Sequence, residues 1–426
     1  MNITEGTRMY ELATRLFPIG RSLTGNGVRE TLKIIQESVP LTIHEVSSGT
    51  AVFDWTVPEE WNVSEAYIVA PDGSRIADYA VNTLHLVGYS TSIDATVSLS
   101  ELQEHLHSLT EQPDAIPYVT SYYAKRWGFC ITDRQRRSLT EGSYRVHIDA
   151  RHTNGSLTYG ELVIPGKKEK EIFISTYLCH PSMANDNISG IVLAVALARW
   201  VAQKPREYTY RIIFIPETIG ALVYLSKHMD YLRERVVAGF VLTCEGDDRT
   251  YSYLPSRLGN TLADRVALRV LREQYPDFQS HSFLKRGSDE RQYCSPGVDL
   301  PVVSLMRSKY DTYPEYHTSL DDLSVVTPQG LQGSYNLHVA CFEHLEAGKL
   351  YRSAQTGEPQ LGRRGLYPTL SQKASVTYSS QQLLDILAYA DGTRLPADIA
   401  EVLGLPENYI ETLLKLLKSH DLLIEE

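Results

Sequence analysis

Three apolar segments that alternate with helical patterns constrain the fold of this chain more than any other feature. The segments KEIFISTYL (170–178), YTYRIIFIP (208–216) and VVAGFVLTC (236–244) have the composition of buried strands. Each is followed by a segment with helical periodicity. Buried strands that alternate with helices are typical of a mostly parallel α/β sheet, so the middle of the chain is predicted to have this architecture.

The regions before these strands have a different sequence pattern. Residues 7–17 and 25–39 have the pattern of two amphipathic helices. Between 51 and 159 lie short β-type runs bounded by turn residues, among them EAYIVAPDGSRIADY and IPYVTSYYAKRWGFCIT. The PDGS within the first of these runs predicts a hairpin turn. A chain of 426 residues has room for two or three domains. We therefore predict a discontinuous α/β core (1–50 and 160–355) with a β-rich domain (51–159) inserted into it.

The last residues, 371–426, form a third unit in this prediction. The segments SQQLLDILAYADGT, LPADIAEVLG and PENYIETLLKLLKSHDLLIEE indicate three short helices and a terminal strand, which is the outline of a winged helix. This region carries four basic and nine acidic residues. A domain that neutralises phosphates is expected to be basic, so we expect docking to protein rather than binding to nucleic acid.

The composition of the whole chain argues against several classes of protein. The net charge of −11 disfavours a general binder of nucleic acid or of acidic membranes. The longest apolar run, GIVLAVALARWVA, is too short to span a bilayer and contains an Arg, and the first residues lack a signal-peptide pattern. We therefore expect no membrane partner. Five scattered cysteines favour a reduced, cytoplasmic location.

Ionisable residues follow the predicted strands where the strands end. His180 follows the first strand, Asp186 lies six residues later in NDN, and Glu217 follows the second strand. Asp289 precedes a further apolar strand, and His317 lies in YPEYHTSLDDL. Each alone could be a satisfied turn residue or a helix cap. Open α/β sheets bind ligands at the carboxyl ends of their strands, so together these residues predict a site. Imidazole and carboxylate groups suit zinc, and a Glu beside zinc can act as a general base.

The segments NDNISG, PETIG, GSDERQY and YHTSLDDL, in this order, resemble the M28 family of zinc aminopeptidases, which includes glutaminyl cyclases. Over its full length the chain resembles aminopeptidase-like proteins of the DUF4910 and DUF2172 type. The resemblance implies a zinc-exopeptidase-like fold, with a mostly parallel mixed sheet flanked by helices. It also implies an inserted β-rich domain and a C-terminal winged-helix domain.

The resemblance also implies site roles. His180, Asp186 and His317 would be zinc ligands, and Glu217 would be the general base that takes a proton from zinc-bound water. Two family carboxylates are absent, because Ser182 and Thr218 stand at their positions. A carboxylate expected after the third strand falls on TCEGDD, where Glu245 or Asp247 could serve and Cys244 stays an option. Since Thr218 removes a ligand of the second metal position, one zinc ion is favoured over two.

Substrate contacts are less constrained. Arg286, Asp289 and Tyr316 could hold a substrate amine, a carboxylate or the tetrahedral oxygen. The Tyr-rich segments YSYLPSR and RSKYDTYPEY either pack loops or form an aromatic rim that narrows the pocket. The inserted domain either covers the site or forms a dimer surface, so a homo-oligomer stays open.

These features together predict a zinc-dependent hydrolase of aminopeptidase type that cleaves a peptide or amide bond of a small substrate. One alternative is an amide hydrolase or acyl-transfer enzyme that acts on a biosynthetic intermediate. Another is a catalytically degenerate protein that only binds, an idea motivated by the two missing carboxylates. The retention of Glu217 favours an enzyme, since a pure binder has no need of a base.

Overall fold

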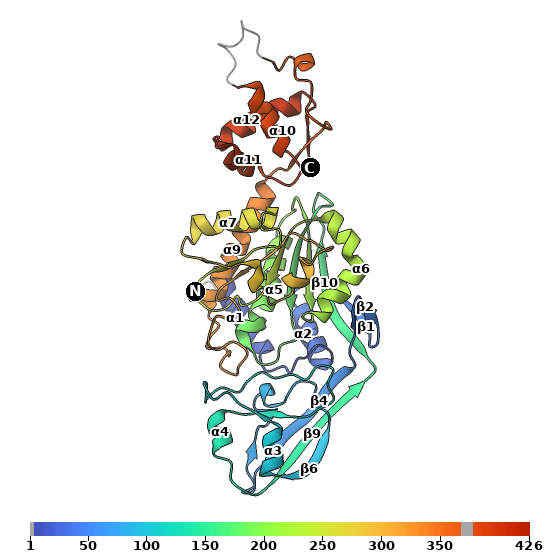
Figure 1. The fold of residues 1–426 in the computed structure, drawn as a ribbon, viewed down its shortest axis with the longest axis vertical. Coiled ribbons are helices and arrows are strands. Elements are labelled where there is room, and N and C mark those ends of the chain that lie inside the picture. Colours follow the sequence, from blue (N-terminus) through green and yellow to red (C-terminus); the bar gives the residue numbers. More distant parts are fainter. Residues whose placement is uncertain (1–3, 368–377) are drawn as a thin grey trace.

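An eight-stranded mixed sheet forms the centre of the computed structural model, which describes residues 4–367 and 378–426 (Figure 1). Its order is β1 (Thr42–Ser47), β10 (Ser156–Ile164), β12 (Thr209–Ile215), β11 (Glu171–Tyr177), β13 (Val236–Leu242), β16 (Val302–Met306), β14 (Ser252–Leu254), β15 (Gln279–Ser280). Strands β12, β11, β13 and β16 are parallel to one another. β1, β10 and β14 pair antiparallel with their neighbours β10, β12 and β16. The predicted mixed sheet of an α/β protein is confirmed.

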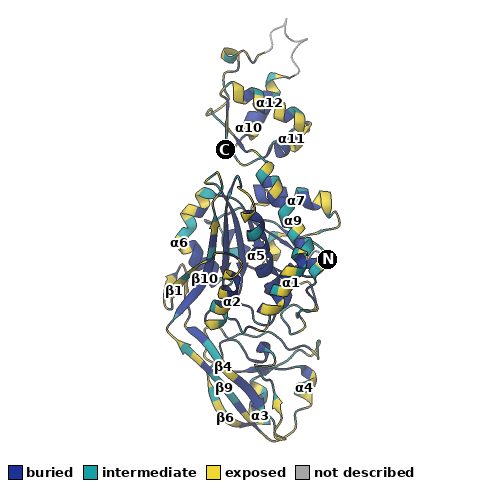
Figure 2. Cartoon of the chain, turned by 180° about the vertical axis from the view of Figure 1, so that it is seen from behind, coloured by how far each residue is buried: buried dark blue, intermediate teal, exposed yellow. Residues whose placement is uncertain are grey.

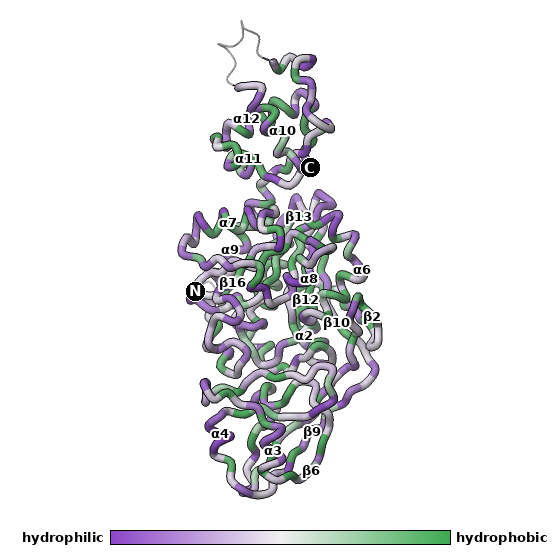
Figure 3. The backbone as a smooth tube through the Cα atoms, in the orientation of Figure 1, coloured by the Kyte–Doolittle hydropathy of each residue, from purple (hydrophilic) through white to green (hydrophobic). Residues whose placement is uncertain are grey.

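Helices cover both faces of this sheet because the strands are apolar on both sides. In β11, Ile172 and Ile174 pack on one face and Phe173 on the other, as alternation along a strand requires. The first face is covered by α1 (Glu5–Leu16), α2 (Asn26–Gln36), α5 (Ser189–Ala202), α7 (Leu262–Gln274) and α9 (Pro328–Ala347). The second is covered by α6 (Ile219–Arg235) and the short α8 (Glu290–Tyr293). Figure 2 shows the buried sheet and α5 in dark blue, and Figure 3 shows the same centre as hydrophobic.

The helix α5 is buried along nearly its whole length, which explains its continuous apolar sequence. Of the helices within residues 4–367 and 378–426, none is long and apolar enough to cross a membrane.

The segment between β1 and β10 builds a second sheet at the opposite end of the molecule from the C-terminus (Figure 1). Its order is β5 (Arg75–Ile76), β4 (Glu60–Val69), β9 (Ser143–Thr153), β6 (Ile93–Ser98), and it has its own apolar core. Shorter elements accompany it: β2 (Ala51–Val52), β3 (Trp55–Thr56), α3 (Leu99–Glu104), β7 (Leu106–His107), β8 (Phe129–Cys130) and α4 (Asp133–Arg137). The predicted turn at PDGS joins β4 to β5, with Gly73 at φ 85°.

One predicted β-run is mostly loop. Of residues 116–132, only Phe129–Cys130 forms a strand. The backbone at Tyr118 pairs with a core loop instead of a sheet edge, since its amide donates to the carbonyl of His317 (2.9 Å). The aromatic side chains that suggested a strand serve another purpose, described below.

A partly buried ion pair joins the inserted sheet to the core. The guanidinium of Arg29 in α2 donates to both carboxylate oxygens of Glu60, at 2.7 and 2.6 Å. Glu60 begins β4 and also accepts from the amide of Ser156, which begins β10 (3.3 Å). The two connections of the insertion are adjacent, because Ser47 and Ser156 are paired in the sheet.

The C-terminal region contains the predicted three helices and terminal strand, and Figure 1 shows it beyond the end of α9. Its elements are β17 (Tyr351–Ser353), α10 (Ser380–Tyr389), α11 (Pro396–Leu403), α12 (Glu407–Ser419) and β18 (Leu423–Glu425). β17 and β18 pair antiparallel and close over the helices. The carboxylate of Asp398 in α11 accepts from Arg265 (2.9 Å) and Arg269 (3.0 Å) of α7, which attaches this region to the core.

Candidate metal centre and pocket

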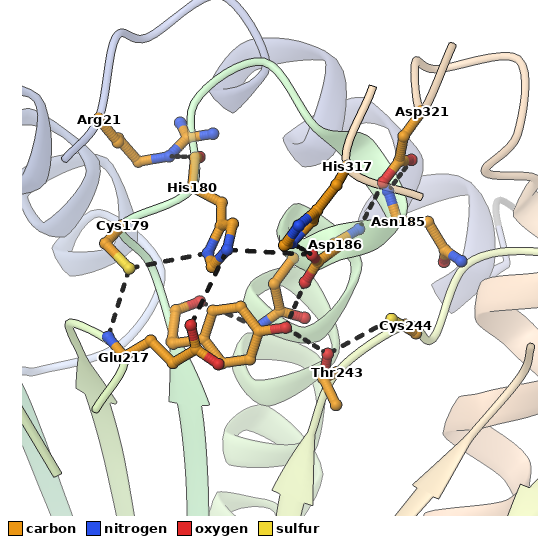
Figure 4. A network of polar contacts seen from close by, with 12 residues as sticks. Arg21, Cys179, His180, Asn185, Asp186, Glu217, Thr243, Cys244, His317 and Asp321 are labelled. Carbon is orange, nitrogen blue, oxygen red and sulfur yellow. Dashed lines mark hydrogen bonds and ion pairs between the residues drawn. The ribbon is translucent and has the colours of Figure 1, made fainter. Parts of the chain in front are cut away.

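Two histidines and one aspartate converge above the carboxyl ends of the central strands. One ligand atom each from His180, Asp186 and His317 lies within 4.8 Å of the others. His180 follows β11, Asp186 precedes α5, and His317 lies in the loop after β16 (Figure 4). These are three of the residues that the strand-end pattern singled out. No other group of three potential ligands lies this close within the described ranges.

The carboxylate of Asp186 is held from several sides but keeps one oxygen available. Its Oδ1 accepts from the hydroxyl of Tyr177. Its backbone amide donates to Asp321 (2.9 Å). Its Oδ2 has no hydrogen-bond partner and faces the two imidazoles, 3.0 Å from His317 Nε2 and 3.9 Å from His180 Nε2. Burial alone would raise the pKa of Asp186, but the two histidines and Tyr177 outweigh it and lower this pKa to about 2.

His180 is in the form that binds metals. Burial lowers the pKa of His180 to about 4, although Asp186 opposes this shift. The imidazole is therefore neutral near pH 7 and can offer a nitrogen lone pair. A neutral imidazole and an ionised carboxylate with an unpartnered oxygen fit the demands of a zinc ion.

Glu217 lies beside this cluster. Its Oε2 is 3.9 Å from His180 Nε2, and its backbone amide donates to the sulfur of Cys179 (3.3 Å). Burial and the nearby carboxylates of Asp289 and Asp186 raise the pKa of Glu217 well above its usual value. A carboxyl group that readily accepts and holds a proton next to a metal site suits general acid–base chemistry.

A pocket of about 400 Å³ opens beside the cluster, and His180 and Glu217 line it. Much of its wall consists of aromatic side chains from the inserted domain: Trp55, Trp61, Tyr79, Tyr89, Tyr118, Tyr122 and Tyr123. The insertion therefore covers one side of the site, which was one of the two options left open by the sequence. The Tyr-rich segments 251–257 and 307–316 contribute no residue to this lining.

Tyr118 links the insertion to the cluster of candidate ligands. Its ring centroid lies 5.5 Å from that of His180 and 5.2 Å from that of His317. The neighbouring residue Pro117 forms a β-bridge with Thr318. The wall of the pocket and the loop that carries His317 are thus held together.

The remaining sequence-predicted residues lie outside the three-residue cluster. Glu245 is fully buried, with its Oε1 3.7 Å from His338 Nε2, and is not part of the three-residue cluster. Arg286 is exposed above the ring of Phe283 and does not line the pocket. Asp289 is buried and accepts from the amide of Thr218 (2.7 Å).

Tyr316 is the predicted substrate residue that lies nearest the cluster. It stacks on His317 with ring centroids 3.9 Å apart, so it contacts a candidate ligand rather than the pocket.

Sequence reasoning missed several residues of the site. Tyr118, Tyr177 and Arg21 all contact candidate ligands, Arg21 through a bond from Nε to the carbonyl of His180 (3.1 Å). Tyr177 could have been found, since it ends the strand that precedes His180. Tyr118 and Arg21 come from distant segments without a motif, so only the folded chain reveals them.

Two family models together match most of the chain. Residues 10–348 match the model of a family described as "Domain of unknown function (DUF4910)", and residues 349–425 match a winged helix-turn-helix model. A protein of Clostridium acetobutylicum named "Putative polysaccharide biosynthesis protein with aminopeptidase-like domain" is 41% identical over 401 residues, which cover 94% of this chain and 92% of that protein.

Solved structures show the same fold. The crystal structure of a "putative peptidase" from Clostridium acetobutylicum superposes with a TM-score of 0.82 at 40% identity, covering 99% of this chain and 96% of that one. A zinc aminopeptidase from Bacillus subtilis superposes with a TM-score of 0.56 at 13% identity, covering 81% and 96%. An M28 peptidase precursor from Shewanella amazonensis gives 0.56 at 11% identity, covering 78% and 92%.

Proposed function

Because this chain belongs to the DUF4910 family and has the fold of M28 aminopeptidases, we propose that it is a zinc-dependent hydrolase of a small peptide or amide substrate. The observation that carries the proposal is the position of Glu217 beside three potential ligand atoms that lie within 4.8 Å of one another. A carboxylate base beside a set of potential metal ligands at the edge of a pocket is an arrangement suited to metal-assisted amide hydrolysis.

In this proposal His180, Asp186 and His317 hold a single zinc ion. Three protein ligands with a further open position are typical of catalytic zinc. The absence of Glu245 from the cluster supports one ion rather than two. Zinc, when bound there, supplies Lewis acidity that activates water and polarises a carbonyl group.

The protein side chains then carry the proton. Glu217 accepts a proton as the water oxygen attacks the carbonyl carbon of the substrate. It donates this proton to the leaving nitrogen as the carbon–nitrogen bond breaks, so a carboxylic acid and an amine result. The raised pKa of Glu217 favours the protonated state that the second half of this cycle needs. Tyr177 and Asp321 keep Asp186 in place through the hydrogen bonds described above.

A second candidate is hydrolysis of an amide on a sugar-containing biosynthetic intermediate. Two observations favour it: the name of the Clostridium relative refers to polysaccharide biosynthesis, and the pocket wall is largely aromatic. Flat aromatic faces offer the large, rigid apolar contact area on which the ring of a substrate can pack.

The test separates metal binding from turnover. Purified wild type, His180→Ala, Glu217→Gln and the control His344→Ala, at a partly exposed His of α9, are analysed for zinc content and screened for cleavage of peptide and acyl-sugar amides. We expect about one zinc per chain, lost only in His180→Ala. Turnover by Glu217→Gln is expected to fall by about 10²–10⁴-fold with zinc retained. Zinc binding without turnover of any amide would favour a protein that only binds.

A further inference from the structure

We propose that the pocket recognises an anionic oxygen group of its substrate, a carboxylate or a phosphate, through the guanidinium of Arg21 with Arg291 as a second cation. The inference rests on the proposed function only in taking this pocket as the substrate site. It adds the chemical class of the substrate.

Arg21 is a buried cation without a counter-ion. The residue is 3% exposed and lines the pocket. Its Nε donates to the carbonyl of His180 (3.1 Å), and its Nη1 donates to the carbonyl of Leu16 at the end of α1 (2.7 Å). Its Nη2 is buried and has no partner. Two nitrogens therefore support the fold, and the third is left for something outside the chain.

Among residues 4–367 and 378–426, no carboxylate forms an ion pair with the Arg21 guanidinium. Arginine is almost never fully buried unless it is paired, because an unpaired charge loses its hydration without compensation. The two backbone carbonyls accept hydrogen bonds but carry no net charge. An anionic ligand in the pocket would complete this environment.

Arg291 is a second cation that lines this pocket. Its Nη2 donates to the hydroxyl of Thr218 (2.6 Å), while its Nε is buried and has no partner. The charge of Arg291 acts on the carboxyl groups of Glu217 and Asp289, but among the described residues neither of them forms an ion pair with it. Arginine binds carboxylate and phosphate oxygens through several parallel N–H donors, which suits both groups.

The rest of the pocket suits an apolar or ring-shaped remainder. Trp61 and Tyr89 stack with ring centroids 5.2 Å apart, and Trp55 and Tyr123 extend the aromatic surface toward solvent. A substrate with an anionic group near the arginines and a flat or apolar body on the aromatic wall matches both halves. The same two cations would repel an ammonium group at that end.

The test uses ligands that cannot be hydrolysed. Binding of 3-phenylpropanoate, 3-phenylpropyl phosphate and neutral 3-phenylpropanol to the zinc-loaded full chain is measured by titration calorimetry. The proteins are wild type, Arg291→Gln, Arg291→Lys, Arg21→Lys and the control Arg145→Gln, whose arginine lies in β9 and pairs with the exposed Asp94. Circular dichroism checks folding and elemental analysis checks zinc. Arg291→Gln keeps the test informative if Arg21→Lys fails to fold.

We expect wild type to bind at least one anion about tenfold or more tightly than the alcohol, since hydrogen bonds to charged groups are worth this much. Arg291→Gln should remove most of that preference with zinc unchanged, Arg291→Lys should retain part of it, and Arg145→Gln should behave as wild type. The anion that loses more affinity identifies the group. Equal binding of anion and alcohol by wild type would overturn the inference. So would a preference for the anion that survives in both Arg291→Gln and Arg21→Lys. Because no turnover is measured, this result is independent of whether the hydrolase proposal holds.

Discussion

The ion pair between Arg29 and Glu60 is expected to be a main support of the junction between core and insertion. Glu60 is 9% exposed and accepts two charge-assisted hydrogen bonds from Arg29. Such bonds contribute roughly 1.5–3 kcal/mol each when buried. The Arg29 side chain is one-quarter exposed and also reaches Glu45 (3.2 Å), so part of its stabilisation survives. We therefore expect Glu60→Gln to lower the free energy of unfolding by about 2 kcal/mol at pH 7.

The pH dependence of this loss has a defined sign. The hydrogen bonds from Arg29 lower the pKa of Glu60 from 4.5 to about 2, against the effect of burial. A depressed pKa stabilises the folded state above pH 4.5, and this stabilisation is lost as the pH falls toward 2. The cost of Glu60→Gln should thus be smaller at pH 4 than at pH 7, by about 0.8 kcal/mol.

Urea unfolding followed by tryptophan fluorescence measures this difference, because Trp55, Trp61 and Trp127 all lie in the insertion. The matched control is Glu65→Gln on the same strand, whose pair with Arg75 is half exposed and should cost less than about 0.5 kcal/mol. If Glu60→Gln costs no more than this control, or costs more at pH 4 than at pH 7, the reasoning about the junction is refuted.

Two further predictions concern the ends of the molecule and the metal. Asp398→Asn weakens the contacts with Arg265 and should destabilise the attachment of the C-terminal region by about 2 kcal/mol. Limited proteolysis should then release this region faster than in wild type, and unchanged cleavage would contradict the prediction. Tyr177→Phe removes the hydroxyl that orients Asp186 and should lower the affinity for zinc by about 10–100-fold. Competition with a chromophoric chelator measures this affinity, and an unaltered value would show that Tyr177 does not support Asp186.

The core could be predicted because its strands are buried on both faces. Every residue of a strand such as β11 is buried, so its sequence is largely apolar and its end is easily located. The cluster of candidate ligands follows from the same logic, since the carboxyl ends of parallel strands meet at one edge of the sheet. His180, Asp186 and His317 came together as expected from their places at these ends.

The pocket could not be predicted, because its wall comes from a segment whose side chains have no periodic constraint. The aromatic residues of 116–132 resemble a strand in composition, but their backbone bonds to a loop some 200 positions away. Arg21 likewise gives no signal in sequence, since a lone arginine between two helices is usually solvated. Glu245 was selected by its place after β13, but the direction of a side chain at a strand end is decided by its neighbours, here His338.

The way in which the insertion is attached limits how the chain can be shortened. Ser47 and Ser156 are paired neighbours, so a tight turn between them could replace the whole intervening segment without breaking the central sheet. The truncated protein would nevertheless lose the bonds from Ile116, Pro117 and Tyr118 that fix the loop bearing His317. The central sheet could therefore close without the insertion, but the loop that carries the candidate ligand His317 would lose the contacts that hold it in place.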